Sequence, residues 1–379
     1  MRILLIGEYS NLHHTLSQGL KKLGHQVTLV SDGDGWKNYP RDVDLTRKGY
    51  SAIHTLGYVF RILRLLPSFR GYDIVQIINP LFLNLKAKQN LRIFRYLKKH
   101  NKRVFLGAFG VDHYWVKACL DKKTFRYSDF YYGTQEIPNP SNPQIIHKWM
   151  HSKRQNVNEE IASNCDGIIA CLYEYYAAYR PHFEKKVTYI PLPIDTEAIP
   201  ARPLREVPEK VRIFIGIQKI RSVSKGTDVI LDVLQKLQAD HPETCEIVKA
   251  ESVPYAEYVR LMADSHILID QLYSYTPAMN ALQAMAQGLV AGSGAEPEMY
   301  RLYDEETLRP IINLCPDRRV LYDQLRETLL NKEKLPELSA QSITFVKKHH
   351  DHIKVAEKYL ETWRVALLTG SNDKNKPDY

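Results

Sequence analysis

Short apolar runs alternate with amphipathic stretches along the first half of the chain. The apolar runs have the length of buried strands, and the amphipathic stretches carry apolar residues at helical spacing. The predicted strands are residues 2–6, 25–30, 73–78, 103–106, 166–171 and 187–190. The predicted helices are residues 13–23, 53–66 and 81–100. Strands that alternate with helices favour a parallel sheet with right-handed crossovers, so we predict an α/β fold of the doubly wound type.

The same alternation restarts after a segment that contains Pro191, Pro193, Pro200 and Pro203. In this second half, the predicted strands are residues 212–216, 245–249 and 266–269, and the predicted helices are residues 226–239, 316–330 and 343–369. A chain of 379 residues is longer than one hydrophobic core usually supports. We therefore predict two domains that meet near residue 195, followed by a polar, disordered tail at residues 370–379.

One segment of the second half is expected to favour an anion. The predicted strand 266–269 ends at Asp270, and a tyrosine-rich loop follows it. Pro277 suits the first turn of a helix that Thr276 caps, and Gly288 suits the position just beyond the end of that helix. A helix that begins at the carboxyl end of a parallel strand presents free backbone N–H groups and the positive end of its dipole. This arrangement favours an anionic ligand such as a phosphate.

Residues 121–150 differ from the rest of the chain because they are aromatic, bear prolines and show no clear period. A long segment without secondary structure inside a compact domain is usually functional. We therefore predict a functional loop or lid here, and its aromatic part, Phe125–Tyr132, is suited to covering a cleft.

Positive charge is concentrated in the first half of the chain. The net charge of the protein is +9, and residues 1–200 hold 28 Lys and Arg against 17 Asp and Glu. Such a surface attracts nucleic acid, anionic lipid or a phosphorylated substrate. Residues 58–70 are both basic and amphipathic, which fits either a helix that meets anionic lipid or a core-facing helix with surface arginines. Most histidines, among them His349 and His350, are expected at the surface.

The cysteines and the apolar runs indicate a cytoplasmic protein. Five cysteines are scattered without a C-x-x-C spacing, so neither a zinc site nor a disulfide framework is indicated. The first residues are too short an apolar stretch for a signal peptide, and no run of 18 apolar residues could cross a membrane. No nucleic-acid-binding motif accompanies the basic residues, so we expect no nucleic-acid partner.

Four sequence segments, in this order, resemble the GT-B glycosyltransferases, and specifically the family 4 (group 1) nucleotide-sugar enzymes. The segments are LSQGLKKLGHQVTLV, CDGIIACLYEYYAAY with VTYIPLPIDTEAI, FIGIQKIRSVSKGTDVIL, and LQAMAQG. The resemblance implies two Rossmann-like domains that face a central cleft. Residues 1–195 would bind the acceptor, residues 196–345 would bind the nucleotide sugar, and a helix at residues 346–369 would pack back on the first domain.

The resemblance also implies roles for individual residues. Lys225 matches the lysine of the family, and Lys219 or Arg221 stands in for its arginine. These cations would stabilise the diphosphate leaving group without a metal or other cofactor. The two glutamates that the family places around the donor are replaced by Tyr275 and Gln283. The residues expected around the donor are Lys219, Arg221, Gln271, Tyr273, Tyr275, Thr276, Asn280, Gln283, Glu296 and Glu298.

In the first domain, Asp112 or His113 would orient or deprotonate the acceptor hydroxyl. The implied activity is transfer of a sugar from a nucleotide sugar to a hydroxyl of a glycan or lipid-linked acceptor, in the assembly of bacterial surface polysaccharide or glycoconjugate. The enzyme would act in the cytoplasm or at the inner, anionic face of the membrane. Two alternatives stay open. The loss of both glutamates suggests a catalytically silent sugar-nucleotide-binding protein, and a GT-B enzyme of another reaction type, such as a sugar-nucleotide epimerase or a phosphorylase, would retain the fold.

Overall fold

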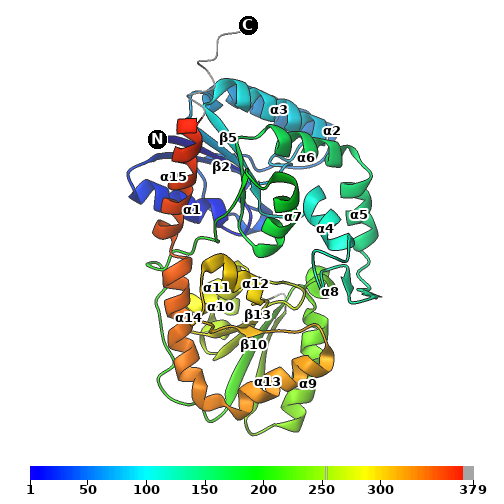
Figure 1. Ribbon diagram of the computed structural model, residues 1–379, viewed down its shortest axis with the longest axis vertical. Helices are drawn as coiled ribbons and strands as arrows, with labels where there is room; N and C mark the ends of the chain where they lie inside the picture. Colours follow the sequence, from blue (N-terminus) through cyan, green and yellow to red (C-terminus); the bar gives the residue numbers. More distant parts are fainter. Residues whose placement is uncertain (252, 254, 370–379) are drawn as a thin grey trace.

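The chain forms two parallel β-sheets, one in each half of an elongated molecule (Figure 1). The computed structural model describes residues 1–251, 253 and 255–369. The first sheet has seven strands in the order β3-β2-β1-β4-β5-β8-β9. These strands are β1 (Arg2–Ile6), β2 (Gln26–Ser31), β3 (Val43–Asp44), β4 (Ile74–Ile77), β5 (Arg103–Ala108), β8 (Gly167–Ala170) and β9 (Val187–Tyr189). The prediction of a doubly wound α/β fold is confirmed.

Helices cover both faces of the first sheet. They are α1 (Leu12–Lys22), α2 (Ala52–Leu65), α3 (Ala87–His100), α4 (His113–Leu120), α5 (Asn142–Met150), α6 (Lys153–Asn164) and α7 (Tyr173–Phe183). The strand order reverses direction at β1, so right-handed crossovers place α1 and α3 on opposite faces. Helix α1 packs against the last helix of the chain, and α3 packs against α6.

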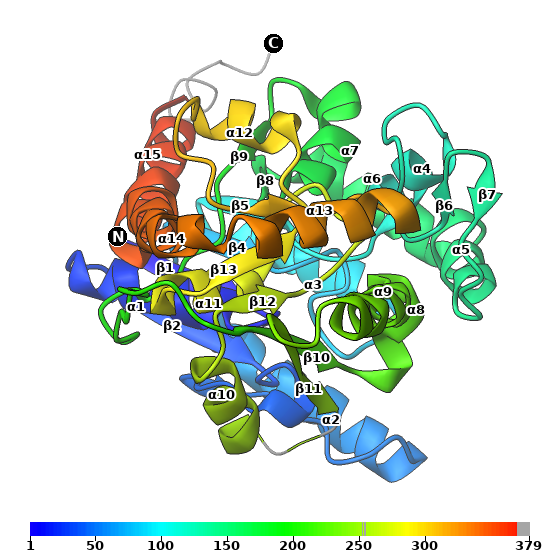
Figure 2. The same ribbon diagram turned by 90° about the horizontal axis from the view of Figure 1, so that it is seen from below.

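The second sheet has five parallel strands in the order β11-β10-β12-β13-β14. They are β10 (Val211–Ile217), β11 (Cys245–Glu251), β12 (Ile267–Ile269), β13 (Val290–Ser293) and β14 (Ile312–Asn313). The helices of this domain are α8 (Ser222–Lys225), α9 (Thr227–Asp240), α10 (Tyr255–Ala263), α11 (Met279–Gln287), α12 (Pro297–Tyr303), α13 (Arg318–Leu330) and α14 (Leu335–His349). Apolar residues of α9 and α13 form one core with the sheet, while α11 packs against α14 (Figure 2).

The chain returns to the first domain through its last two helices. One helix was predicted for residues 343–369, but the structure has α14 and then α15 (His352–Thr369). The break lies where His350 O accepts a hydrogen bond from Ile194 N at 2.7 Å and Asp351 caps the first amides of α15. His349 and His350 are buried at this junction, so their expected place at the surface was wrong. Their ring nitrogens bond to Glu305 and to Leu192 O, which offsets the cost of burial.

Three further expectations are settled by the described residues. Residues 121–150 are not free of secondary structure, because they contain a short hairpin, β6 (Tyr131–Tyr132) and β7 (Gln135–Glu136), and helix α5. Helix α11 begins at Met279, so Pro277 lies outside it and Thr276 is not its cap. Gly288 does end α11, with a φ of 108°. The predicted tail, residues 370–379, lies outside the described residues. No described helix is long and apolar enough to span a membrane.

The contact between α1 and α15 leaves no room for a side chain at Gly19. A Cβ atom there would lie 2.4 Å from His352 O, which is backbone and cannot swing away. We expect Gly19→Ala to lower the midpoint of thermal unfolding, because overpacking costs about 1–3 kcal/mol and outweighs the helix preference of alanine, about 1 kcal/mol. Gly57→Ala is the control, since nothing lies within 4 Å of its Cβ position. Equal stability of the two variants would contradict this account of the packing.

Candidate functional site

A charged cluster lies at the carboxyl end of β12 in the second domain. Lys225 ends α8, and Gly226 follows it with a φ of 68° that starts α9. The Nζ atom of Lys225 lies 3.0 Å from Oδ1 of Asp270, and Asn280 Nδ2 donates to the same oxygen at 3.2 Å. Leu272 N donates to Lys225 O at 2.8 Å, which holds the lysine beside the strand end. Two predicted residues, Lys225 and Asn280, are therefore joined by Asp270, which sequence reasoning did not select.

The side chain of Asp270 is buried, and its second oxygen, Oδ2, has no hydrogen-bond partner among the described residues. A buried carboxylate oxygen without a donor is costly, so this atom is suited to accepting a hydrogen bond from a hydroxyl group. The side chain of Lys225 is 22% exposed and supplies a cation beside it. The cluster therefore places a partly exposed cation beside a buried acceptor oxygen.

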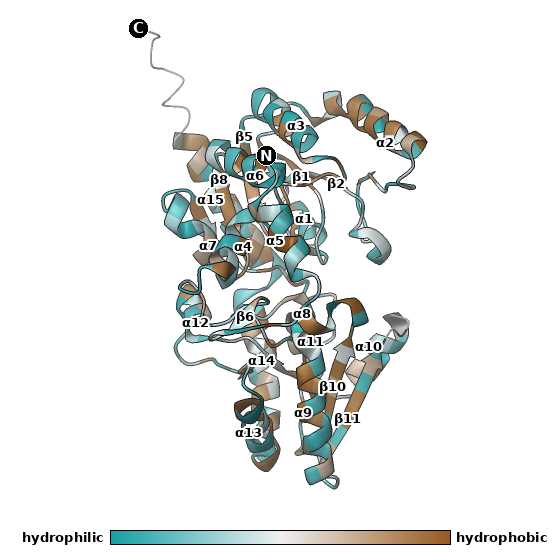
Figure 3. Cartoon of the chain, turned by 90° about the vertical axis from the view of Figure 1, so that its right-hand side faces the viewer, coloured by the Kyte–Doolittle hydropathy of each residue, from teal (hydrophilic) through white to brown (hydrophobic). Residues whose placement is uncertain are grey.

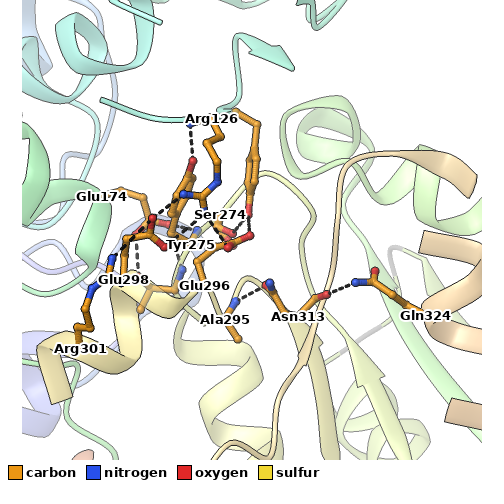
Figure 4. Close-up of polar contacts among 12 residues, drawn as sticks. Arg126, Glu174, Ser274, Tyr275, Ala295, Glu296, Glu298, Arg301, Asn313 and Gln324 are labelled. Atoms are coloured by element: carbon orange, nitrogen blue, oxygen red, sulfur yellow. Dashed lines mark hydrogen bonds and ion pairs between the residues drawn. The ribbon is translucent and has the colours of Figure 1, made fainter. Parts of the chain in front are cut away.

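A second cluster, the interdomain bridge, joins Arg126 and Tyr127 of the first domain to Tyr275, Glu296 and Glu298 of the second (Figure 4). The guanidinium of Arg126 donates hydrogen bonds to both glutamates, and its Nη2 atom lies 2.7 Å from Oε2 of Glu296. Tyr127 OH donates to Glu296 at 2.7 Å, and Arg126 N donates to Tyr275 OH. Burial opposes ionisation of Glu298, but the hydrogen bond from Arg126 holds its pKa below the usual value.

The ring of Tyr275 is stacked between two first-domain tyrosines. Its centroid lies 4.7 Å from that of Tyr127 and 5.5 Å from that of Tyr173, with interplanar angles of 28° and 27°. Burial raises the pKa of Tyr275 to about 12, so the phenol is neutral. Tyr275 is thus engaged by the predicted loop Phe125–Tyr132, which lies across the domain interface.

The loop before α11 is held by a carboxylate from the first domain. Glu174, in the first turn of α7, accepts hydrogen bonds from Tyr275 N at 2.6 Å and from Thr276 N at 3.2 Å. Thr276 Oγ1 donates to its other oxygen at 2.9 Å. Burial raises the pKa of Glu174, and the backbone donors partly oppose this rise. These amides lie where an anionic ligand was predicted, and in the structure a carboxylate of the chain itself binds them.

The loop that leads into α12, where Glu296 and Glu298 lie, is fixed by close packing against Ser274. A Cβ at Gly294 would lie 1.9 Å from Ser274 O, so only glycine fits there. Ala295 N donates to Asn313 Oδ1 at 2.8 Å, and Gln324 Nε2 donates to Asn313 O at 2.8 Å. Figure 4 shows this chain of contacts running from the two glutamates toward α13. The two carboxylates are therefore held at defined positions.

The other predicted donor residues lie apart from these contacts. Lys219 is exposed and pairs with Glu251 at 3.3 Å, and Arg221 is exposed. Gln271 and Gln283 are half-buried, and their side chains form no hydrogen bond with the described residues. Tyr273 is half-buried and packs near Gly226. Their roles toward a donor stay predictions.

The structure places both predicted acceptor residues of the first domain inside the fold. Asp112 caps α4 by accepting from Trp115 N at 2.9 Å, and Tyr179 OH donates to it at 2.7 Å. Burial raises the pKa of Asp112 to about 6. His113 is buried too, with Nδ1 2.9 Å from Trp149 O. Neither side chain reaches a surface here, so contact with an acceptor would require the start of α4 to open.

A cavity of about 310 Å³ opens at the carboxyl ends of β1, β2 and β4. Its lining includes Glu8, Tyr9, Asp32, Tyr58 and Arg154. Glu8 caps α1 by accepting from His13 N at 3.2 Å and His14 N at 2.8 Å. Burial raises the pKa of Glu8 to about 8, although these donors lower it. Ligands usually bind at the carboxyl ends of the strands of a doubly wound sheet, and this polar cavity lies at such strand ends.

Sequence reasoning missed Arg126, Tyr127, Glu174 and Asp270. Asp270 carried a signal, because it is the first polar residue after a buried strand. Arg126 and Tyr127 lie in the aromatic loop that was predicted to cover a cleft, but no sequence pattern indicated which residues they contact. Among the described residues, no group of three or more His, Cys, Asp or Glu is arranged to hold a metal ion.

The sequence matches no protein-family model and is similar to no curated protein. Solved structures do resemble its fold. Sucrose-phosphate synthase from Thermosynechococcus elongatus superposes with a TM-score of 0.60 at 13% identity, over 97% of this chain and 100% of the other. HepE from Anabaena, in complex with UDP-glucose, gives 0.59 at 12% identity, over 96% and 100%. A glycosyltransferase from Rickettsia africae gives 0.55 at 13% identity, over 97% and 98%. With its two parallel sheets, the chain has the GT-B fold.

The interdomain bridge leads to a prediction about local opening. We expect Arg126→Ala to speed amide hydrogen exchange both in residues 125–127 and in residues 296–298, because the ion pairs of Arg126 with Glu296 and Glu298 join these two segments. A partly exposed ion pair contributes up to about 1 kcal/mol, so exchange should rise by up to about fivefold. The control is Arg318→Ala, which breaks an exposed pair with Asp232 inside the second domain. Faster exchange on one side only would show that the ion pairs do not couple the two segments.

Glu8 leads to a prediction about pH. Because its pKa rises from 4.5 to about 8 on folding, the folded chain keeps a proton that the unfolded chain loses between these values. Its contribution to stability is therefore full below pH 4.5 and is lost as pH rises toward 8.

The Glu8→Gln variant has no ionisable group at this position, so its stability lacks this pH dependence. Its unfolding midpoint, followed by circular dichroism, should improve relative to the parent between about pH 5 and 8, by on the order of a few kcal/mol in free energy. Parallel pH curves for the two proteins would mean that folding does not raise the pKa of Glu8.

Proposed function

We propose that the protein is a glycosyltransferase that moves a sugar from a nucleotide sugar to a hydroxyl of an acceptor. The observation that carries this proposal is the charged cluster of Lys225, Asp270 and Asn280, at the strand ends of the second domain and facing the first. In an open α/β sheet, ligands bind beyond the carboxyl ends of the strands. HepE, which has the same fold, was solved with UDP-glucose, and this supports a nucleotide sugar as the ligand.

Lys225 is suited to the step in which the bond to the leaving diphosphate breaks. Negative charge grows on the diphosphate as this bond breaks, and a positioned cation stabilises the transition state more than the ground state. The unpaired Oδ2 of Asp270 is suited to accept a hydrogen bond from a hydroxyl of the donor. Asp270 also holds the lysine in place, so the two residues act as a unit.

Glu296 and Glu298 are suited to bind hydroxyl groups of the donor sugar. Carboxylates accept strong hydrogen bonds from such groups, and these two are held by the packing at Gly294. In the structure, Arg126 donates to both carboxylates. A donor sugar would therefore compete with Arg126, and the freed guanidinium would lie near the reacting groups as a second cation.

The acceptor is proposed to bind in the first domain, at the cavity lined by Glu8, Asp32 and Arg154. Carboxylates, a tyrosine and an arginine around one cavity suit a polyhydroxyl compound, so a glycan or lipid-linked glycan fits this lining. One solved structure with the same fold, WaaG, is a glycosyltransferase of lipopolysaccharide biosynthesis, with a TM-score of 0.54 at 11% identity. This supports a role in bacterial surface polysaccharide or glycoconjugate assembly at the inner face of the membrane.

The proposal is tested by turnover of a nucleotide sugar that binds the protein. Uridine, guanosine and adenosine diphosphate sugars are first screened for thermal stabilisation, since a ligand of the folded state raises the unfolding midpoint. With a donor that binds, Lys225→Ala should lower turnover by about ten- to a hundredfold, because a charge-assisted contact is worth ~1.5–3 kcal/mol. Donor affinity should change less than turnover.

The control is Lys236→Ala, on the exposed surface of α9 and outside the charged cluster. A folded Lys225→Ala variant with the turnover of the parent would remove this lysine from the mechanism. Nucleotide binding without transfer or hydrolysis would favour the silent binding protein. Conversion of the nucleotide sugar into its epimer would favour the epimerase.

A further inference from the structure

The loop Phe125–Tyr132 contains a tight turn that places Asp129 at the domain interface. Ser128 N donates a hydrogen bond to Tyr131 O at 2.9 Å, which closes the turn around Asp129. Asn142 Nδ2 donates to Asp129 O at 3.1 Å and holds the tip of the turn in place. Figure 3 shows β6, which follows this turn, beside α8 of the second domain. A first-domain carboxylate is therefore held at a defined position next to the second domain.

The side chain of Asp129 faces positive charge of the second domain without contacting it. Asp129 is half-buried, and its carboxylate forms no ion pair with any described residue and no hydrogen bond with another one. The positive charges that act on it are those of Arg221 and Lys225, at the two ends of α8. We call these two residues the cation pair. Lys225 also pairs with Asp270, whereas the exposed Arg221 has no carboxylate partner among the described residues.

The surroundings of Asp129 bring its proton equilibrium close to neutral pH. Burial raises the pKa of Asp129 from 3.8 to about 7, the cation pair opposes this rise, and the carboxylate of Glu174 adds to it. Cys119, Tyr175 and Tyr273 also face Asp129, but burial raises their own pKa values and keeps them neutral. A change in the charge around the cation pair therefore shifts the protonation of Asp129.

The neighbouring residues of the same loop contact the other polar groups of the cleft. Arg126 donates hydrogen bonds to Glu296 and Glu298, and the hydroxyl of Tyr127 donates to Glu296 at 2.7 Å. A hydroxyl on a carboxylate, next to a carboxylate that faces two cations, is the polar pattern of a sugar bound through a hydroxyl and a phosphate. The loop thus brings, from within the chain, the charges that an anionic sugar compound would bring.

We propose that Asp129 is the internal counter-ion of the cation pair, and that an anion binding at this pair is accompanied by uptake of a proton onto Asp129. The proton comes from the solvent and forms an O–H bond on the carboxylate. An ionised Asp129 repels the anion, whereas a neutral one does not, so protonation and anion binding favour each other to the same extent. The inference rests on the proposed function only in taking the diphosphate of the donor as the natural anion.

The direction of the pH dependence follows from this linkage. An anion at the cation pair raises the pKa of Asp129 further, because it adds negative charge beside the carboxylate. Below the pKa of the free protein, about 7, Asp129 already carries its proton, and anion affinity does not change with pH. Above this value, affinity should fall by up to about tenfold for each pH unit, because one proton is linked to binding.

The test is titration of the full chain with sodium sulfate at constant ionic strength, since sulfate has no proton to gain or lose near neutral pH. Binding is followed by the NMR shifts of the backbone amides of residues 222–227. At about pH 8, Asp129→Asn should bind sulfate about tenfold more tightly than the parent, and its affinity should not fall with pH. An increase in affinity cannot result from a loss of folding.

The matched control is Glu136→Gln, which removes one exposed carboxylate from β7, on the hairpin that follows the turn. This variant should keep the affinity of the parent and its pH dependence. An equal gain in Glu136→Gln would overturn the proposal, because net charge alone would then explain the effect. Absence of sulfate binding, affinity in the parent that is independent of pH, or the same fall with pH in Asp129→Asn would also overturn it.

Assays with nucleotide sugars separate this inference from the proposed function. If sulfate binding shows the expected pH dependence, but no nucleotide sugar is bound or turned over, the transferase proposal fails and the role of Asp129 stands. If a nucleotide sugar is turned over, but sulfate affinity is independent of pH, the role of Asp129 fails and the transferase proposal stands.

Discussion

A carboxylate buried between two domains needs hydrogen bonds from its surroundings, and Glu174 obtains them from the opposite domain. Its oxygens accept from Tyr275 N, Thr276 N and Thr276 Oγ1, so the first turn of α7 is fixed to the loop before α11. Without these donors the buried charge would be costly, which makes the contact specific as well as stabilising. The position of Tyr275 between Tyr127 and Tyr173 follows from this anchor.

The anchored loop also positions the interdomain bridge. Because Tyr275 is fixed, Arg126 can donate its backbone N–H to the phenol and its guanidinium to Glu296 and Glu298. The ion pairs are partly exposed, with 55% of the Arg126 side chain open to solvent, so they are individually weak. A bridge of weak contacts around one buried anchor can open locally while the two domains keep their relation through Glu174 and α15. Glu296 and Glu298 are then both pre-positioned and accessible.

Helix α2 shows how one element can serve two surfaces. Its inner face needs only Tyr58 and Ile62 to attach it to the first domain. The rest of its surface is therefore free to carry apolar side chains that would otherwise belong to a core. The cost of exposing them in water is large, and it is recovered only when something apolar covers them.

The alternation of apolar runs and amphipathic stretches determined the fold class, because a parallel sheet covered on both faces requires strands that are apolar throughout. The same rule indicated that a strand ends at Asp270, although Asp270 was not selected as a site residue, and Lys225 was selected by its resemblance to a family pattern. The pairing of side chains that are distant in the sequence could not be predicted. Arg126 and Glu298 are 172 positions apart, and Glu174 and Thr276 are 102 apart, so only the folded chain brings them together.

Predictions from the local sequence also failed where a contact with a residue distant in the sequence was stronger than the local preference. The sequence of Thr276 and Pro277 predicts the start of a helix. In the structure, the hydroxyl and the amide of Thr276 instead donate hydrogen bonds to Glu174, and α11 begins at Met279. The long helix predicted at 343–369 breaks because Ile194 bonds to His350 O at the crossing between domains. The outward direction of α2 was likewise decided by tertiary structure, since an amphipathic pattern states that one face is apolar and leaves open what that face meets. Periodicity fixes the local period of the backbone, whereas partners distant in sequence fix where each element ends and which way it faces.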